Sequence, residues 1–418
     1  MVEFYDPAPG SHRRWVMFAV GSINFVISMF YRVSTAVISP TLIREMGLTT
    51  AQLSDLSAAF YYAFALFQVP LGIALARLGP RITMAFLGGC AVGGAVLFAT
   101  GETAERLVLA RVLLGIGMSG NLMVLLALVA AWFPVNRFGF LSGSAVAVGT
   151  LGNILAATPL AALCQWVGWR WSFLLFAGIN AAIVAAFVVT IRDRPESGRS
   201  SGRKKPSLFG GLRRLLRMYG YWAISIMNFV RYGYISSLQS LWLVPFLILG
   251  LGYDEMDAGN ALLAMSVGYM VGLPLWGALS DRVLRSRKWT VVPNTVCYCL
   301  LVLTICFWTE QVSFLLVTTT CFLLGTAAAS GQVSYAHIKE LVPASMSAQA
   351  LTSVNLFTTL GGGAMIHVLG MLLGKDPSNL MGPAGYRPLW VVGFVLLAGV
   401  SLLYLAVPDS RFTKAEDA

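Results

Sequence analysis

Residues 107–132 read LVLARVLLGIGMSGNLMVLLALVAAW and contain one charged side chain, that of Arg111. The run is longer than the roughly 20 apolar residues that a helix needs to cross the hydrocarbon core of a bilayer. Inside lipid every backbone N–H and C=O group must be bonded within the protein, and a helix satisfies nearly all of its own groups. The stretch therefore predicts a membrane-spanning helix.

The rest of the chain repeats this pattern. Of its 418 residues 57% are hydrophobic and 11% are charged, whereas soluble domains carry about 25% charged residues. Apolar runs bounded by charge, glycine or proline predict twelve spans: Trp15–Pro40, Leu53–Leu75, Ile82–Thr100, Leu107–Trp132, Phe138–Trp166, Trp171–Ile191, Tyr221–Leu249, Ala258–Leu279, Trp289–Trp308, Val312–Ile338, Leu351–Leu373 and Trp390–Val407. We therefore expect an all-α membrane protein with twelve transmembrane helices.

Basic residues in the loops predict the orientation. Of the 29 lysines and arginines, 21 fall on the side that holds both termini and five on the other side. By the positive-inside rule both termini face the cytoplasm, and we expect a multi-pass protein of the cytoplasmic (inner) membrane. A long basic segment separates the sixth and seventh runs, so we predict an N-terminal six-helix bundle over 1–191, a cytoplasmic linker over 192–220 and a C-terminal six-helix bundle over 221–418.

Several classes of protein are disfavoured. The net charge of +11 comes from loops between apolar runs and not from a basic stripe with interleaved aromatic residues, so we expect no nucleic acid partner. All six cysteines lie inside apolar runs, where they are typical of small buried side chains, and we expect neither a metal site nor a cofactor. An intramembrane enzyme is disfavoured because the chain lacks the HExxH motif, a deep carboxylate pair and a Ser/His arrangement on neighbouring spans.

The two halves carry related motifs at corresponding places, which is typical of an internally duplicated transporter. The motif after the second run is GIALARLGPR, with Gly72, Arg77, Gly79 and Arg81. The motif after the eighth run is GALSDRVLRSRK, with Gly277, Asp281 and Arg282. A third motif, RVLLGIG in the fourth run, contains Arg111, Gly115 and Gly117.

Together these motifs resemble the loop and helix motifs of the major facilitator superfamily. The resemblance implies two pseudo-symmetric six-helix bundles that move a substrate by alternating access, with glycines that permit close helix contact and an aspartate, here Asp281, that locks the cytoplasmic gate. Ala76 stands at the aspartate position of the first copy, which departs from the pattern. The glycines also have a simpler interpretation, namely helix packing through small residues, and the two interpretations are compatible. For Arg111 the packing role is favoured.

Two further arginines inside the spans indicate a substrate site. An unpaired arginine at a helix centre costs about 2.5–3.5 kcal/mol, so Arg32 in the first run and Arg231 in the seventh each need a partner or a water-filled cavity. These runs are equivalent in the two halves, and we expect both guanidinium groups to reach one central cavity and to bind a carboxylate or phosphate. A structural ion pair is the alternative. Tyr31-Arg32 and Arg231-Tyr232-Gly233 resemble the first and seventh helices of the organophosphate/phosphate antiporters and the related anion:cation symporters.

Three positions at which the sequence departs from those two families bear on how transport is coupled to an ion. Gln68 stands where the antiporters have a lysine, and Tyr31 and Met118 stand where the symporters have acidic residues. Proton coupling through those positions is unsupported, so we expect exchange, facilitated transport or a proton site elsewhere. The coupling partner is accordingly a proton or a counter-anion.

Polar side chains on the inner helices complete the candidate substrate site, although helix-to-helix hydrogen bonding is the alternative for each. They are Tyr31, Tyr61, Tyr62, Gln68, Asn121, Gln239, Gln332, Tyr335 and Asn355. The predicted function is secondary active or facilitative transport of a small organic anion by a monomer surrounded by membrane lipids. The alternatives are an exporter of drug-like or siderophore-like molecules and a non-transporting nutrient sensor on the same fold.

Overall fold

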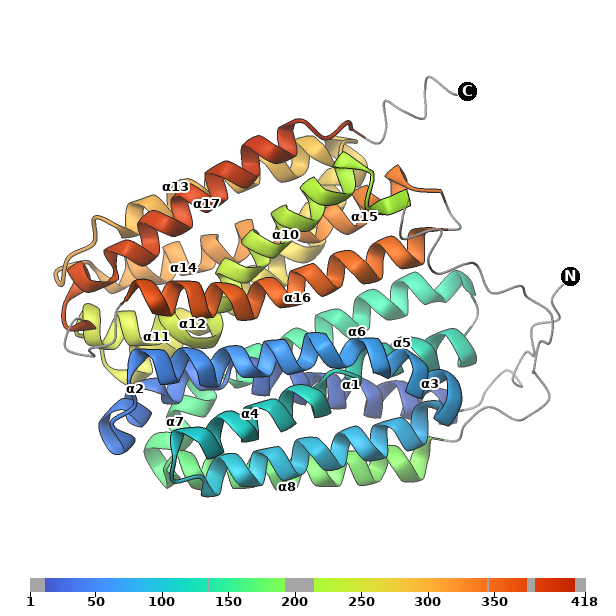
Figure 1. Ribbon diagram of the computed structural model, residues 1–418, viewed down its shortest axis with the longest axis horizontal. Coiled ribbons are helices and arrows are strands. Elements are labelled where there is room, and N and C mark those ends of the chain that lie inside the picture. The colour runs from blue at the N-terminus through green and yellow to red at the C-terminus, as the bar shows by residue number, and fades with distance from the viewer. Residues whose placement is uncertain (1–11, 134, 192–213, 344–345, 374–379, 410–418) are drawn as a thin grey trace, which may run out of the picture. The chain divides into compact units, whose positions relative to one another are not determined.

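The computed structural model describes residues 12–133, 135–191, 214–343, 346–373 and 380–409. Within these ranges the chain is helical apart from short connections, which confirms the predicted all-α membrane fold (Figure 1). Eleven helical stretches in the described chain are long and apolar enough to cross a membrane. The twelfth predicted span, Leu53–Leu75, is also helical but lies inside the 51-residue helix α3 (Thr50–Thr100) and is not among the eleven.

Contacts divide the chain into two compact units. Unit 1 consists of Met1–Ser34 and Ala59–Ser201. Its helices, besides α3 from Ala59 onward, are α1 (His12–Val33), α4 (Ala104–Met118), α5 (Asn121–Trp132), α6 (Val135–Leu155), α7 (Thr158–Val167) and α8 (Trp169–Thr190). In this unit α1 packs against α6, α5 and α8, so the first helix forms the centre of the bundle.

Unit 2 consists of Thr35–Ala58 and Gly202–Ala418. Its helices, besides the start of α3, are α2 (Thr35–Met46), α10 (Tyr219–Ser237), η2 (Leu238–Trp242), α11 (Leu243–Pro245), η3 (Phe246–Gly250), α12 (Glu255–Ala278), η4 (Leu279–Val283), α13 (Lys288–Ile305), α14 (Phe314–Ala329), η5 (Ser330–Gln332), α15 (Val333–Leu341), α16 (Ser347–Leu372), η8 (Pro383–Tyr386) and α17 (Arg387–Leu405). Within this unit the most extensive helix contacts are those of α12 with α14, α10 with α16, and α13 with α17 (Figure 1).

The predicted division at a 192–220 linker stays a prediction. Residues 192–213 of that linker lie outside the described chain. Contacts group residues 35–58, which belong to the first half by sequence, with unit 2.

Glycines set the closest helix crossings in both units. In unit 2 a Cβ atom on Gly268 would overlap the carbonyl oxygen of Phe322, and one on Gly325 would overlap that of Met265, so α12 and α14 touch backbone to backbone. In unit 1 a Cβ atom on Gly115 would overlap the carbonyl oxygen of Phe60. Small residues allow such approaches in membranes, where helix association depends on van der Waals packing because lipid supplies no hydrophobic driving force.

Gly79 is needed for its backbone conformation and not for a close helix crossing. Gly79, in the loop motif between the second and third predicted spans, has φ +77° and ψ 170° within α3. An L side chain is strained at that backbone conformation, whereas glycine adopts it readily. Gly79 therefore allows the chain to change direction between two helical segments.

Candidate functional site

Arg231 is buried in unit 2 and is only partly hydrogen-bonded. Its side chain lies on α10 and the residue is 2% exposed. Nη2 donates to the carbonyl oxygen of Ala327 at 3.0 Å and to Oγ of Ser330 at 2.8 Å. Nε and Nη1 are buried and have no hydrogen-bond partner among the described residues. Because a buried charge is costly when its donors are unsatisfied, this guanidinium is suited to receiving a further acceptor.

The guanidinium contributes to the wall of a small pocket of about 10 Å³, which in this conformation has room for about one water molecule. Five helical elements of unit 2 contribute its walls. The lining residues are Asn228, Arg231, Tyr232, Ile235, Tyr269, Ala328, Gly331, Gln332 and Thr358. Gly331 keeps the approach to the charge open, since a Cβ atom there would lie 3.2 Å from Nη1 of Arg231.

Polar side chains at and near the pocket are hydrogen-bonded to one another. Nε2 of Gln332 donates to the hydroxyl of Tyr269 at 3.1 Å. The hydroxyl of Tyr335 lies 2.9 Å from Oγ1 of Thr358 and donates to Oδ1 of Asn355 at 3.3 Å. The pocket thus combines one cation with hydroxyl and amide groups, and such a set can bind an anion that carries hydroxyl groups.

The structure brings together four of the five predicted site residues of the second half. Arg231 and Gln332 line the pocket. Tyr335 is hydrogen-bonded to Thr358, which also lines the pocket, and to Asn355. The fifth, Gln239, donates instead to Oγ of Ser266 at 3.4 Å and does not line the pocket.

Sequence reasoning missed Asn228, Tyr269 and Thr358. Asn228 precedes Arg231 by three residues, a spacing that places both on one face of a helix, and this signal could have found it. Its Nδ2 donates to Oγ of Ser334 at 2.7 Å, which holds the side chain beside the pocket. Tyr269 and Thr358 lie on other helices, and no sequence signal associates them with Arg231.

Arg32 lies in unit 1 against an aromatic wall. Its guanidinium carbon is 4.9 Å from the ring centroid of Phe64 and 5.9 Å from that of Tyr61, which are distances typical of cation–π contacts. The side chain of Arg32, on α1, is half-buried, and so are those of Tyr62 and Gln68 on α3. Arg32, Tyr61, Tyr62 and Gln68 therefore remain candidates for substrate contact in this unit.

Arg111 connects α4 to α1 as a packing residue. It is fully buried, and its Nη1 donates to the carbonyl oxygen of Tyr31 at 2.6 Å. Its guanidinium also lies 4.7 Å from the ring centroid of Phe60. These contacts agree with the packing role that the sequence favoured.

Tyr31 and Asn121 also have packing contacts. The ring of Tyr31 is fully buried, 5.3 Å from that of Phe30 and 6.2 Å from that of Phe173. Nδ2 of Asn121 donates to the carbonyl oxygen of Asn24 at 2.9 Å, from α5 to α1. For these two predicted site residues the structure shows the helix-to-helix contacts that were the alternative.

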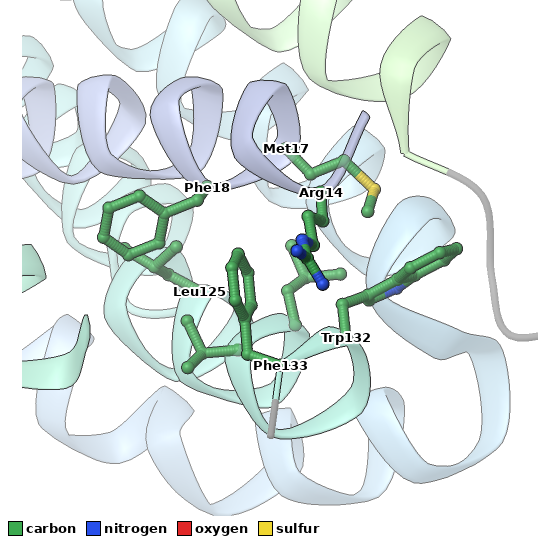
Figure 2. Close-up of a pocket in the computed structure, with 8 residues that line it drawn as sticks. Arg14, Met17, Phe18, Leu125, Trp132 and Phe133 are labelled. Atoms are coloured by element: carbon green, nitrogen blue, oxygen red, sulfur yellow. The ribbon is translucent and has the colours of Figure 1, made fainter. Parts of the chain in front are cut away.

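A second pocket, too small to hold a water molecule, lies between α1 and α5 in unit 1. Its lining residues include Arg14, Met17, Phe18, Leu125, Trp132 and Phe133, and Figure 2 shows Arg14 between the rings of Phe133 and Trp132. The guanidinium of Arg14 lies 5.8 Å from the ring centroid of Phe133. None of the predicted substrate-binding residues lines this pocket, and its walls are mostly apolar.

The motif glycines fall into two groups. Gly115 and Gly117 sit at close helix crossings, as predicted. Gly72 and Gly277 do not, because a Cβ atom at either would meet no described heavy atom within 4 Å. The expectation of close helix contact at these two positions was wrong. The resemblance supplied that expectation, and local sequence cannot say which helix face meets a neighbour.

Asp281 is paired, although not with the neighbouring Arg282. Its carboxylate accepts from Nη1 of Arg287, and Nη2 of the same arginine lies 2.9 Å from Oε1 of Glu340. Burial alone would lower the pKa of Arg287, but the hydrogen bonds to Glu340 and Asp281 outweigh it, so the pKa is raised. Four other arginines of the loop motifs are exposed, namely Arg77, Arg81, Arg282 and Arg285.

Changing Arg287 to Ala should destabilise unit 2. The two carboxylates would lose their shared cation, and we expect the free energy of unfolding to fall by about 1 kcal/mol, the upper end for partly exposed pairs. Thermal melting of purified protein measures the change. Lys339→Ala, an exposed basic residue next to Glu340, serves as the control. Equal melting of the two variants would show that the network does not stabilise the unit.

The fold and the site define an α-helical membrane protein with a cationic polar pocket among its spans. The family model of the Major Facilitator Superfamily matches residues 20–259 and 224–417, so the chain belongs to this superfamily. It is a membrane transporter and not an enzyme, as the sequence predicted.

Three known proteins illustrate the similarity. The chain is 25% identical to the "Probable sulfoacetate transporter SauU" of Cupriavidus necator over 65% of its own length and 66% of that protein. It is 30% identical to the D-galactonate transporter of Escherichia coli O6:H1 over 42% of this chain and 41% of the other. The crystal structure of a bacterial homologue of the human lysosomal transporter Spinster covers 95% of this chain and 97% of its own, with a TM-score of 0.76 at 16% identity. The last match concerns the fold alone.

Proposed function

We propose that the protein moves a small organic anion across the cytoplasmic membrane by alternating access, and that Arg231 binds the anionic group. The observation that carries the proposal is the buried Nη1 of Arg231, which faces the pocket without a described acceptor. An arginine keeps its charge at any physiological pH, so the pocket attracts anions throughout. A bound carboxylate would provide the acceptor that the guanidinium lacks.

The class of anion follows from the other walls. Tyr269, Gln332, Asn228 and Thr358 offer donors and acceptors that suit the hydroxyl groups of a sugar acid or hydroxy acid. Relatives named for sulfoacetate and D-galactonate transport support a carboxylate or sulfonate. A phosphate ester is the second choice, because Gln68 stands where the phosphate antiporters have a lysine.

Arg32 is proposed as the second contact of the same anion. Its sequence position in the first span corresponds to that of Arg231 in the seventh, and its aromatic surroundings leave it half-buried. Two arginines from the two halves would let one anion interact with both bundles during the transport cycle.

A ligand screen tests the proposal. Purified protein would be melted with D-galactonate, tartrate, sulfoacetate, glycerol 3-phosphate, uncharged galactose and an amphiphilic cation. We expect a carboxylate or sulfonate to stabilise the protein, by about 2.7 kcal/mol at 100 times its dissociation constant. Stabilisation by the cation alone would favour the exporter. Binding without uptake into proteoliposomes would favour the sensor.

The proposed orientation has its own test. We expect the loop between η4 and α13 to face the cytoplasm and the loop between α13 and α14 to face outward, because basic residues favour the cytoplasmic side. Cysteines replacing Arg285 and Gln311, both exposed, would be placed singly in a variant without the six native cysteines. A membrane-impermeant thiol reagent should label Gln311→Cys in intact cells and Arg285→Cys only in opened cells. The reverse pattern would invert the topology.

A further inference from the structure

The tenth predicted span changes its helix type beside Arg231. Within the helical stretch Phe314–Leu341, the 3₁₀ turn η5 (Ser330–Gln332) separates α14 from α15. A 3₁₀ stretch inside a long helix often marks a functional hinge or local strain. Each of the three residues of this turn is hydrogen-bonded to Arg231 or lines the small pocket at its guanidinium. The turn is therefore the part of the span whose geometry bears directly on the buried charge.

The guanidinium is fixed at one end. Its Nη2 donates to the carbonyl oxygen of Ala327 and to Oγ of Ser330, and that hydroxyl donates to the same carbonyl at 2.8 Å. Within the part of the chain that the structure describes, no carboxylate forms an ion pair with Arg231. Nη1 cannot turn toward another acceptor unless the bonds of Nη2 break, so it stays directed away from them.

The turn that faces Nη1 is also held in place. Oγ of Ser334 donates to the carbonyl oxygen of Gly331 at 2.7 Å. Nδ2 of Asn228 donates to that hydroxyl at 2.7 Å and to the carbonyl oxygen of Ile224 at 3.0 Å. This chain of hydrogen bonds connects η5 to α10, which carries the arginine. The gap between Gly331 and Nη1 therefore persists, because hydrogen bonds fix both of its sides.

The gap exists because residue 331 has no side chain. A Cβ atom on Gly331 would lie 3.2 Å from Nη1 of Arg231, and 3.8 Å from both its Cζ and Oδ1 of Asn228. Gly331 does not have a positive φ, so its backbone conformation does not itself require glycine. Any larger residue would place its first side-chain atom where an acceptor for Nη1 has to sit. The glycine thus matters for the space that it leaves.

Stability and anion binding favour different residues at this position. A buried donor without an acceptor lowers stability, and Nη1 is such a donor. Serine at position 331 would bring a hydroxyl oxygen next to Nη1 and satisfy it from within the protein. The same oxygen would then occupy the place that an anion needs.

We propose that Gly331 is a positioning residue for the transported anion, an inference that rests on the proposed role of Arg231 in anion transport. By leaving Nη1 unsatisfied, it allows one oxygen of the anion to complete the coordination of the guanidinium. The substrate-free protein is less stable as a result. An acceptor that the chain itself supplies at this place competes with the anion.

Melting of two variants without any ligand gives the first test. Gly331→Ser offers Nη1 an acceptor after the guanidinium shifts by a few tenths of an ångström, whereas Gly331→Ala fills the gap and offers none. A hydrogen bond to a charged group is strong enough that Gly331→Ser should melt at least about 2 °C above Gly331→Ala. A serine variant that melts no higher than the alanine variant would overturn the inference.

Gly399 supplies the matched control. It is exposed on α17, and a Cβ atom there meets no described heavy atom within 4 Å. Alanine is the better helix former, so Gly399→Ser should melt no higher than Gly399→Ala. A serine advantage of equal size at both positions would show that it does not come from Arg231, and would refute the inference.

Anion binding gives the second test. Affinities for D-galactonate, tartrate and sulfoacetate would be measured by ligand-dependent melting. Both Gly331 variants should bind the anion at least about tenfold more weakly than the unmodified protein, because the place beside Nη1 is filled. Gly399→Ser should bind as the unmodified protein does. Greater stability with weaker binding in Gly331→Ser distinguishes positioning from general damage to the fold, and unchanged affinity in that variant would contradict the inference.

A double variant identifies the donor. Arg231→Lys removes Nη1, so in that background the melting advantage of serine over alanine at position 331 should disappear. An advantage that persists would show that the hydroxyl has another partner, which would overturn the inference. Absence of binding by the unmodified protein for every anion would count against the proposed function. Binding by the unmodified protein without any serine advantage would count against the role of Gly331 alone.

Discussion

Arg231→Ala should abolish measurable binding of the transported anion at concentrations that saturate the unmodified protein. The substitution removes the buried cation beside the pocket, and losing one partner of a buried charged pair costs about 2–5 kcal/mol, which is roughly 30-fold to several-thousand-fold in affinity. Arg231→Lys keeps the charge but replaces the planar fork by a point donor, so we expect a loss of at least about tenfold. Ligand-dependent melting of the purified variants measures both effects.

Two comparisons make this result specific. Arg106→Lys, at an exposed position of α4, should bind as the unmodified protein does. Arg32→Lys should resemble Arg231→Lys if both arginines contact the anion. An unchanged affinity in Arg32→Lys alone would leave Arg231 as the anion contact and disprove the two-arginine site. Unchanged affinity and melting in Arg231→Lys would disprove the proposed role of Arg231.

Gly325→Ala should greatly reduce the yield of folded protein. The added Cβ atom would overlap the carbonyl oxygen of Met265 and would lie 2.8 Å from the backbone nitrogen of Tyr269. Because both obstacles are backbone atoms, no rotamer change relieves the clash, and α12 and α14 must separate. Overpacking of this kind costs about 1–3 kcal/mol or more, and here it also displaces Tyr269 from the pocket. Size-exclusion profiles and melting temperatures of purified protein provide the measurement.

Gly399→Ala is the matched control for this substitution. Gly399 lies within α17, and a Cβ atom there would meet no described heavy atom within 4 Å. Alanine favours a helix over glycine by about 1 kcal/mol, so this variant should be as stable as the unmodified protein or slightly more stable. Gly277→Ala should behave in the same way, which checks the absence of a close contact at that motif position. Similar losses in all three variants would show that helix packing does not distinguish these glycines.

The glycines also illustrate how far a motif extends into three dimensions. The RVLLGIG motif predicted close packing correctly at Gly115 and Gly117, whereas the loop motifs suggested it at Gly72 and Gly277, where the space is open. A motif records residue types along one segment. The closeness of a helix crossing depends on the second helix, which the motif does not contain.

The sequence by itself determined the membrane class and the spans, and it identified Arg231 as a candidate site residue. These inferences depend on the hydropathy of single segments and on the cost of placing one charge in lipid, and both are local quantities. The superfamily followed from short motifs, which are local as well. Only the tertiary structure decided which side chains surround that charge, which arginine pairs with Asp281, and that Asp55 meets His367. Such pairings depend on the rotation and crossing of helices, and backbone contacts at residues such as Gly325 and Gly370 set these. Partners hundreds of residues apart become neighbours only when the whole unit has packed.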